Sequence, residues 1–160
     1  MAGVPACCQQ VASMIAPSNK AQLFSAWHLL LCAWALALVA SLSALFIGEV
    51  MGQAPCNLCW FQRVFMFPLA IVLGVACYRS DATVWRYALP IAGLGWLVAL
   101  YHSLLYFGVF GDSIQPCGAG GSCSSSNMAI FGAIALPVLS LIVFSLICML
   151  LLMISRRSTQ

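Results

Sequence analysis

Residues 23–47 read LFSAWHLLLCAWALALVASLSALFI, an apolar run that is interrupted only by His28 and a few serines. As an α-helix this run spans roughly 37 Å at about 1.5 Å per residue, whereas the hydrocarbon layer of a bilayer is ~30 Å thick. The run is therefore long enough to cross a membrane with some tilt. We expect a membrane-spanning helix over these residues.

The composition of the whole chain points the same way. Of its 160 residues, 64% are hydrophobic and 6% are charged, and the mean hydropathy is +1.06. About a quarter of the residues of an ordinary soluble domain are charged, so the composition excludes such a domain and indicates a membrane protein. The net charge of +3 comes from scattered Lys and Arg residues. Because these residues form no basic patch, they do not indicate nucleic-acid binding.

Three further apolar stretches are long enough to cross a membrane, namely Leu58–Cys77, Tyr87–Phe110 and Met128–Ile154. Pro137 lies inside the last of them, where neighbouring helices tolerate a proline. The predicted fold class is therefore all-α, a polytopic membrane four-helix bundle. We expect one four-helix domain over residues 23–154, an N-terminal segment over 1–22 and a short tail over 155–160.

The charges between these stretches predict the orientation of the bundle. Basic residues flank the start of the first stretch, the turn after the second and the end of the fourth: Lys20, Arg79, Arg86, Arg156 and Arg157. The other two connections, 48–57 and 111–127, contain Glu49 and Asp112 but no Lys or Arg. The positive-inside rule therefore places both termini in the cytoplasm and these two loops outside. A cleavable signal peptide is the alternative for the first run, but its length fits an uncleaved anchor better.

Nine cysteines fall into classes according to this topology. Cys32, Cys77 and Cys148 lie in apolar stretches, and we expect them to be small buried hydrophobic residues. Cys7 and Cys8 lie in the predicted cytoplasmic segment, where thiols stay reduced, so free thiols are favoured over a metal-binding or acylated role.

The remaining four cysteines lie in the two outer loops, as Cys56-x-x-Cys59 and as the pair Cys117 and Cys123. Three interpretations compete: two structural disulfides, a four-cysteine zinc site, or a redox-active exchange system. Structural disulfides would close short loops and stabilise little, and the zinc site would lack polar neighbours to orient its ligands. A C-x-x-C pair at a helix N-terminus has its thiolate favoured by the helix dipole and by free backbone N–H groups. We therefore favour redox exchange.

Polar residues inside the membrane lie close to the C-x-x-C pair. Gln62 and Arg63 follow Cys59 by three and four residues, so a helix places them next to it. An arginine in hydrocarbon needs a partner, or else its side chain reaches back to the interface. We expect Arg63 to stabilise a Cys59 thiolate and to donate hydrogen bonds to an oxygen of a lipid-soluble acceptor. His102 is predicted at a similar depth, and a purely structural, hydrogen-bonded histidine is the alternative there.

The ordered motifs of the chain resemble a known family. Residues 48–63 read GEVMGQAPCNLCWFQR and are followed by Met66-Phe67-Pro68, by Tyr101-His102 and by Pro116-Cys117…Cys123. This series is similar to the DsbB family (disulfide bond formation protein B) of membrane thiol oxidases, in particular to its BdbC-like branch with a short second outer loop. Five residues separate Cys117 from Cys123, whereas the best-known members have a long loop there.

The resemblance implies an activity and roles for the cysteines. Enzymes of the family re-oxidise a soluble DsbA-like protein of the thioredoxin fold outside the cytoplasmic membrane and pass its electrons to membrane quinone. Cys56 and Cys59 would form the redox-active disulfide beside the quinone, with Cys59 in contact with it. Cys117 and Cys123 would form the disulfide that is exchanged with the partner.

The resemblance also implies a cofactor site and a location. Arg63 would bind the quinone, which would be ubiquinone or menaquinone, and no metal is implied. Gln62 and His102, from their positions in the helices, are further candidate cofactor-binding residues. The chain would lie in the bacterial cytoplasmic (inner) membrane, with both cysteine pairs on the periplasmic or extracellular side. Two alternatives stay open: a quinone reductase of the vitamin K epoxide reductase type, in which C-x-x-C usually falls late in the bundle, and a non-enzymatic membrane protein with two structural disulfides.

Overall fold

The computed structural model describes residues 19–52, 55–109, 129–130 and 134–158 of the chain. Within these ranges the chain forms four long helices, α2 (Asn19–Leu45), α3 (Asn57–Arg79), α4 (Trp85–Tyr106) and α5 (Leu136–Ser158). Each of them contains a span that is long and apolar enough to cross a membrane. The predicted class, an all-α bundle of four membrane helices, is confirmed.

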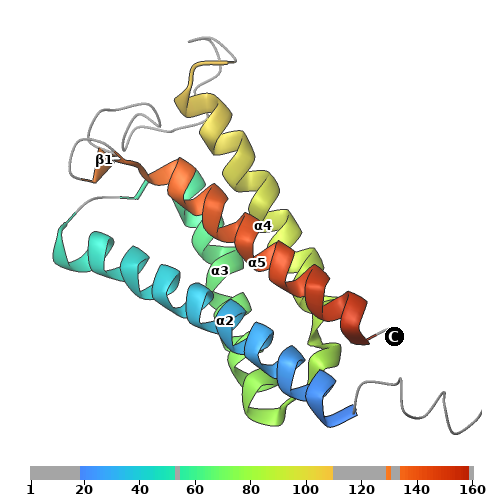
Figure 1. Ribbon diagram of the computed structural model, residues 1–160. Helices are drawn as coiled ribbons and strands as arrows, with labels where there is room; N and C mark the ends of the chain where they lie inside the picture. Colours follow the sequence, from blue (N-terminus) through green and yellow to red (C-terminus); the bar gives the residue numbers. More distant parts are fainter. Residues whose placement is uncertain (1–18, 53–54, 110–128, 131–133, 159–160) are drawn as a thin grey trace, which may run out of the picture.

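The helices run alternately up and down (Figure 1). The start of α2, the turn between α3 and α4 and the end of α5 lie at one end of the bundle, and the connection from α2 to α3 lies at the other. Helix α4 packs along α5, while α2 packs against both α3 and α5. The described chain also contains the 3₁₀-helix η2 (Ala82–Val84) and an antiparallel pair of two-residue strands, β1 (Ala129–Ile130) and β2 (Ile134–Ala135).

Local chemistry explains where the helices begin and end. Helix α3 begins after Cys56, whose backbone is extended and whose side chain caps the first turn, and it ends at Ser80, whose φ of 52° lies in the left-handed region. Helix α5 begins at Leu136 and not at the predicted Met128. Pro137 is thus its second residue, where the missing N–H would have had no helical partner in any case. Helix α4 ends at Tyr106, short of the predicted Phe110, and the chain turns at Gly108 with a φ of 70°.

The C-terminal end of α2 continues as a π-helix, η1 (Phe46–Val50). The backbone N–H of Met51 donates to the carbonyl oxygen of Phe46 over 3.2 Å, an i to i+5 bond that accommodates one extra residue per turn. Part of the predicted first outer loop is therefore helical, and Gly48 lies inside η1 rather than in an irregular loop.

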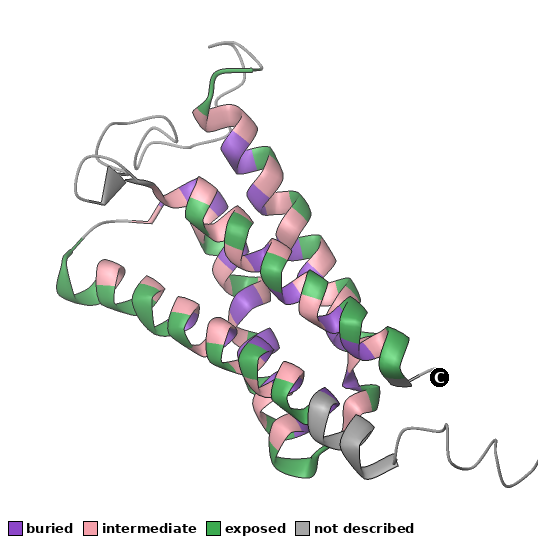
Figure 2. Ribbon diagram, in the orientation of Figure 1, coloured by how far each residue is buried: buried purple, intermediate pink, exposed green. Residues whose placement is uncertain are grey.

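Small residues bring the helices close together. Ala33 and Ala37 of α2, and Ala92 and Ala99 of α4, are fully buried, as is typical of helix contacts inside membranes. Figure 2 shows the buried residues on the inner faces of the helices and the exposed ones on the outer faces. Cys32 is exposed, contrary to the prediction, because its neighbour Ala33 occupies the inward position of that turn.

Candidate functional site

The two cysteines of the C-x-x-C motif meet at the N-terminus of α3. Their sulfur atoms lie 2.8 Å apart, as a hydrogen-bonded pair of thiol groups. The Sγ of Cys56 also accepts a hydrogen bond from the backbone N–H of Cys59 over 3.3 Å. This contact exists because Cys56 is the N-cap residue, and its side chain therefore faces the unpaired N–H groups of the first turn. Cys56 is buried and Cys59 is partly exposed.

A buried polar pair contacts Cys56 from inside the bundle. His102, on α4, has no exposed surface, and its Nε2 lies 3.8 Å from the Sγ of Cys56. The other ring nitrogen, Nδ1, lies 3.1 Å from the side-chain nitrogen of Gln62. Gln62 lies on α3 and is 9% exposed. A connected set of side chains therefore runs from Cys56 through His102 to Gln62.

These contacts favour ionisation of Cys56 in the reduced pair. The hydrogen bond from the Cys59 side chain, followed by the contact with His102, lowers the pKa of Cys56 to about 4. Contacts from the side chain and backbone N–H of Cys59 and from His102 meet at the sulfur of Cys56, and the thiolate expected on Cys59 stays a prediction. Cys56 receives the backbone contact because it is the N-cap residue, whereas Cys59 lies inside the helix.

Arg63 is anchored by the end of α2. Its Nη2 donates a hydrogen bond to the carbonyl oxygen of Ala44 over 2.6 Å, and its guanidinium carbon lies 5.5 Å from the centre of the Trp60 ring. A Cβ atom at Gly48 would lie 3.1 Å from Nη2 and 3.2 Å from Nη1, so a glycine leaves room for the guanidinium. The expected partner of the intramembrane arginine is thus a backbone carbonyl on the neighbouring helix.

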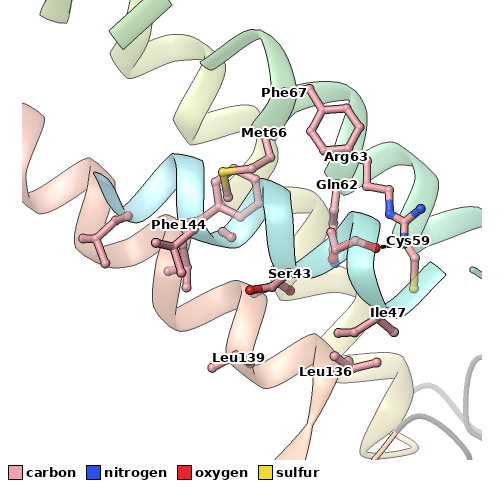
Figure 3. Close-up of a pocket in the computed structure, with 16 residues that line it drawn as sticks. Ser43, Ile47, Cys59, Gln62, Arg63, Met66, Phe67, Leu136, Leu139 and Phe144 are labelled. Atoms are coloured by element: carbon pink, nitrogen blue, oxygen red, sulfur yellow. Dashed lines mark hydrogen bonds between the residues drawn. The ribbon is translucent and has the colours of Figure 1, made fainter. Parts of the chain in front are cut away.

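A pocket of about 290 Å³ opens beside the C-x-x-C pair. Its wall comes from α2, η1, α3 and α5, and Figure 3 shows Cys59, Gln62 and Arg63 at one end of it. Apolar side chains form most of the remaining wall, among them Leu36, Val39, Ile47, Met66, Phe67 and Val143. His102 is not part of this wall, although its partner Gln62 is. The pocket suits an apolar molecule with an oxygen acceptor that faces Arg63.

The same residues offer ligands for a soft metal ion. The sulfurs of Cys56 and Cys59 and a ring nitrogen of His102 all lie within 4.8 Å of one another. A structural zinc site takes four ligands, and the part of the chain that the structure describes brings three together here. The zinc interpretation considered above relied on four cysteines, two of which, Cys117 and Cys123, lie outside the described residues.

Sequence reasoning missed two contributors to this site. Gly48 gave a weak signal, as a glycine close to the end of a long apolar run. Ala44 gave none, because its contribution is a backbone carbonyl that every residue type possesses. The predicted neighbours of Cys59, in contrast, follow from helical spacing, and the structure brings Gln62 and Arg63 to the same pocket as Cys59.

Comparisons with known proteins agree with this arrangement of a cysteine pair in a four-helix membrane bundle. The family model described as "Disulfide bond formation protein DsbB" matches residues 25–154. The molecule is thus a membrane protein of disulfide bond formation, which is an oxidation of thiols. The chain belongs to the DsbB family. This membership decides against the vitamin K epoxide reductase type.

Individual relatives support the same assignment. A "Probable disulfide formation protein" of Metapseudomonas resinovorans is 59% identical over 134 residues, which are 83% of this chain and 93% of the relative. A protein of the same description from Deinococcus radiodurans is 41% identical over 74% of this chain and 83% of its own. The "Disulfide bond formation protein C" of Bacillus subtilis is 35% identical over 82% of this chain and 95% of its own. No solved structure matches the chain significantly.

Proposed function

We propose that this protein is a dithiol:quinone oxidoreductase of the bacterial cytoplasmic membrane. It re-oxidises a soluble, DsbA-like protein of the thioredoxin fold outside the membrane and passes two electrons to membrane quinone, either ubiquinone or menaquinone. One observation carries the proposal above all. The C-x-x-C pair adjoins an apolar pocket in which Arg63 is held by a hydrogen bond to Ala44.

The residues of the pocket fit a quinone. Apolar side chains line most of it, while the guanidinium of Arg63 and the amide of Gln62 offer hydrogen-bond donors for a carbonyl oxygen. A volume of about 290 Å³ is near the lower limit of small-molecule sites, which suits a ring whose tail extends elsewhere. A bound quinone supplies an acceptor for two electrons and two protons.

In this proposal the Cys117 and Cys123 pair reacts with the soluble partner protein, and the Cys56 and Cys59 pair reacts with the membrane quinone. A thiolate from the reduced Cys117 and Cys123 pair attacks the sulfur of Cys56 in the Cys56–Cys59 disulfide. The bond between Cys56 and Cys59 breaks, a new disulfide to Cys56 forms, and Cys59 leaves with the electron pair as a thiolate. Since Cys59 lines the pocket, this charge arises next to the quinone site and near Arg63.

Arg63 then acts by holding a fixed positive charge close to Cys59. Its anchor on Ala44 keeps the guanidinium at the pocket, so little reorganisation is needed when the negative charge appears. In a water-poor environment such an attraction is stronger than it would be in bulk solvent. Because this positive charge belongs to the Arg63 side chain, a substitution of Arg63 removes it.

Turnover by the purified protein tests this proposal. Protein in detergent, supplied with a reduced DsbA-like dithiol and a soluble ubiquinone or menaquinone analogue, should oxidise the dithiol and reduce the quinone. Cys59→Ser should abolish both reactions, because no disulfide remains beside the pocket. Cys32→Ser is the matched control, since Cys32 is exposed on the outer face of α2, and it should retain full activity. Quinone reduction that persists in Cys59→Ser would contradict the mechanism.

A further inference from the structure

The contacts of His102 differ from those of a cofactor ligand. The side chain is fully buried on α4 and forms no part of the pocket wall. Both of its ring nitrogens are nevertheless engaged, Nε2 with Cys56 over 3.8 Å and Nδ1 with Gln62 over 3.1 Å. The site therefore contains a histidine that the proposed binding of quinone does not use.

The chemistry of the amide group fixes the proton on this ring. The side-chain nitrogen of Gln62 is a donor and cannot accept, so Nδ1 of His102 is the acceptor of their hydrogen bond. A neutral imidazole carries one proton, which then resides on Nε2, the nitrogen that faces Cys56. A second proton on Nδ1 would face the N–H group of Gln62 and would place a charge in a fully buried site, which is unfavourable.

We propose that Gln62 and His102 form a positioning pair for Cys56, in which Gln62 sets the tautomer of His102 and the Nε2–H of His102 donates a hydrogen bond to the Cys56 sulfur when it is a thiolate. This inference rests on the proposed function in one respect, namely that Cys56 takes part in thiol–disulfide exchange. It assigns His102 to the cysteine pair rather than to the quinone pocket.

The pair would act at one defined step of the exchange. When a disulfide between Cys56 and another cysteine is resolved by an attacking thiolate, the bond to Cys56 breaks and a new disulfide forms elsewhere. Cys56 leaves with the electron pair as a thiolate, and the Nε2–H group stabilises that charge without giving up its proton. The step is redox-neutral, and His102 is uncharged before and after it. A better leaving group leaves faster, so the pair would accelerate the release of Cys56.

The surroundings of Cys56 support a specific effect of this hydrogen bond. The titratable groups that face Cys56 within the described residues are Cys59, on the same helix, and His102, on α4. Leu58 and Leu105 belong to the same apolar cluster as Cys56. The side chain of Cys59 makes the largest contribution to lowering the pKa of Cys56, and the hydrogen bond from His102 adds to it, against the opposing effect of burial.

The tautomer can be measured directly in the unaltered protein. Nitrogen NMR of the reduced protein labelled with ¹⁵N-histidine distinguishes a protonated Nε2 from a protonated Nδ1, and a His28→Asn variant assigns the second histidine signal. We expect the proton of the His102 ring to be on Nε2. A signal that shows the proton on Nδ1, or a doubly protonated ring, would overturn the proposal.

The effect on Cys56 can be measured by alkylation. The parent protein for this experiment has every cysteine except Cys56 replaced by serine, and its Cys59→Ser change keeps a hydroxyl donor beside Cys56. The alkylation rate is then followed against pH. His102→Phe should shift the midpoint upward and reduce the thiolate fraction by about tenfold at a pH below both midpoints, because a hydrogen bond to a charged group is lost. Gln62→Leu should shift it in the same direction, by less, because the tautomer is no longer fixed.

A matched control lies next to His102. Ser103 is also buried, and its hydroxyl donates to the carbonyl of Ala99 within its own helix, so Ser103→Ala should leave the alkylation profile unchanged. Superimposable profiles for His102→Phe and the parent protein would overturn the proposal. If His102→Phe does not fold, the alkylation profile of Gln62→Leu and the NMR measurement still test the proposal. None of these measurements contains quinone or a partner protein, so a failure of the proposed electron transfer would leave their outcome unaffected.

Discussion

Arg63 shows how a single residue can be held in an environment that is unfavourable for its charge. A guanidinium inside hydrocarbon costs several kcal/mol unless it has partners. Arg63 has a carbonyl acceptor on α2, an aromatic neighbour in Trp60 and space provided by Gly48. Each of these contacts holds the side chain at the pocket. The charge is therefore positioned before any substrate arrives.

Arg63→Ala should weaken the quinone step more than the exchange between cysteine pairs. We expect the apparent KM for a quinone analogue to rise by about tenfold to a hundredfold, as for the loss of one charge-assisted hydrogen bond. Arg86→Ala is the control, since Arg86 also lies beside a tryptophan, Trp85, but at the other end of the bundle. Steady-state kinetics with varied quinone check this. An unchanged KM in Arg63→Ala would mean that the side chain merely reaches to the interface.

The ionisation of Cys56 makes the stability of the reduced protein depend on pH. Its folded pKa of about 4 lies below the value of about 8.5 for a free cysteine. Between these two values the unfolded state binds more protons, so the stabilisation grows as the pH rises and is lost as the pH falls through 4. The thermal stability of the reduced protein should therefore increase from pH 5 to pH 8 relative to Cys56→Ala. Parallel melting curves for the two proteins over this range would contradict the assignment.

The residues of the site differ in how far the sequence predicted them. Gln62 and Arg63 follow from helical spacing, because three and four residues after Cys59 is one turn. The contact between His102 and Cys56 connects residues 46 positions apart, and only the packing of α3 against α4 brings them together. The depth of His102 in the membrane can be read from the sequence, whereas its neighbours on other helices cannot, and its predicted contact with a cofactor stays a prediction.

At the scale of helices and strands, the backbone of η1 helps to position Arg63 at the pocket. The π-helical turn occurs where α2 meets Arg63, and it contains Gly48. The sequence placed the end of this apolar run at Ile47, close to the observed change from α2 to η1, but nothing in it predicted a π-helix. A hydrophobic run indicates the length of a membrane helix. Whether that helix contains a π-helical turn with an extra residue depends on its contacts with a neighbouring helix.

Gly48→Ala tests whether η1 positions Arg63. An added Cβ would come within 3.2 Å of the guanidinium, so Arg63 should shift away from Ala44 and the KM for quinone should rise. The informative measurement is a double-mutant cycle with Arg63→Ala. In the Arg63→Ala background, the Gly48→Ala change should have almost no further effect. Equal effects of Gly48→Ala in both backgrounds would show that it acts independently of Arg63.

Gly95 of α4 illustrates how closely the helices pack. A Cβ atom at this position would overlap the ring of Phe144 on α5, which is fully buried. Gly95→Ala should therefore destabilise the bundle by about 1–3 kcal/mol, as overpacking does in well-filled cores. Gly93→Ala is the control two residues away, because nothing lies within 4 Å of a Cβ there. Thermal unfolding in detergent compares them, and equal melting temperatures would contradict this view of the contact between α4 and α5.

At the scale of the whole molecule, the four antiparallel helices place the two ends of the bundle on opposite sides of a membrane. The last turn of α3 contains Arg79 and the last turn of α5 contains Arg156 and Arg157, and these two helix ends lie at the same end of the bundle (Figure 1). The fold thus brings the basic residues to one end and the C-x-x-C pair to the other. The sequence predicted this separation, because charge counts need only the order of the helices.

Labelling of single cysteines tests the predicted orientation. In a cysteine-free protein, Met51→Cys should react with a membrane-impermeant maleimide applied to intact spheroplasts. Ser80→Cys, in the turn after α3, should react only after the membrane is opened. Both residues are exposed, so access to the reagent depends on the side of the membrane alone. The reverse pattern would place the C-x-x-C pair in the cytoplasm and would contradict the proposed function.

The wall of the pocket has a consequence for how such a protein can diversify. Cys59 and Arg63 come from α3, whereas most of the apolar wall comes from α2 and α5. Substitutions on those two helices can therefore reshape the space for an acceptor while the thiol chemistry stays intact. Under the proposed function, replacing Val39 or Leu139 should change the preference for one quinone over another without changing the cysteines.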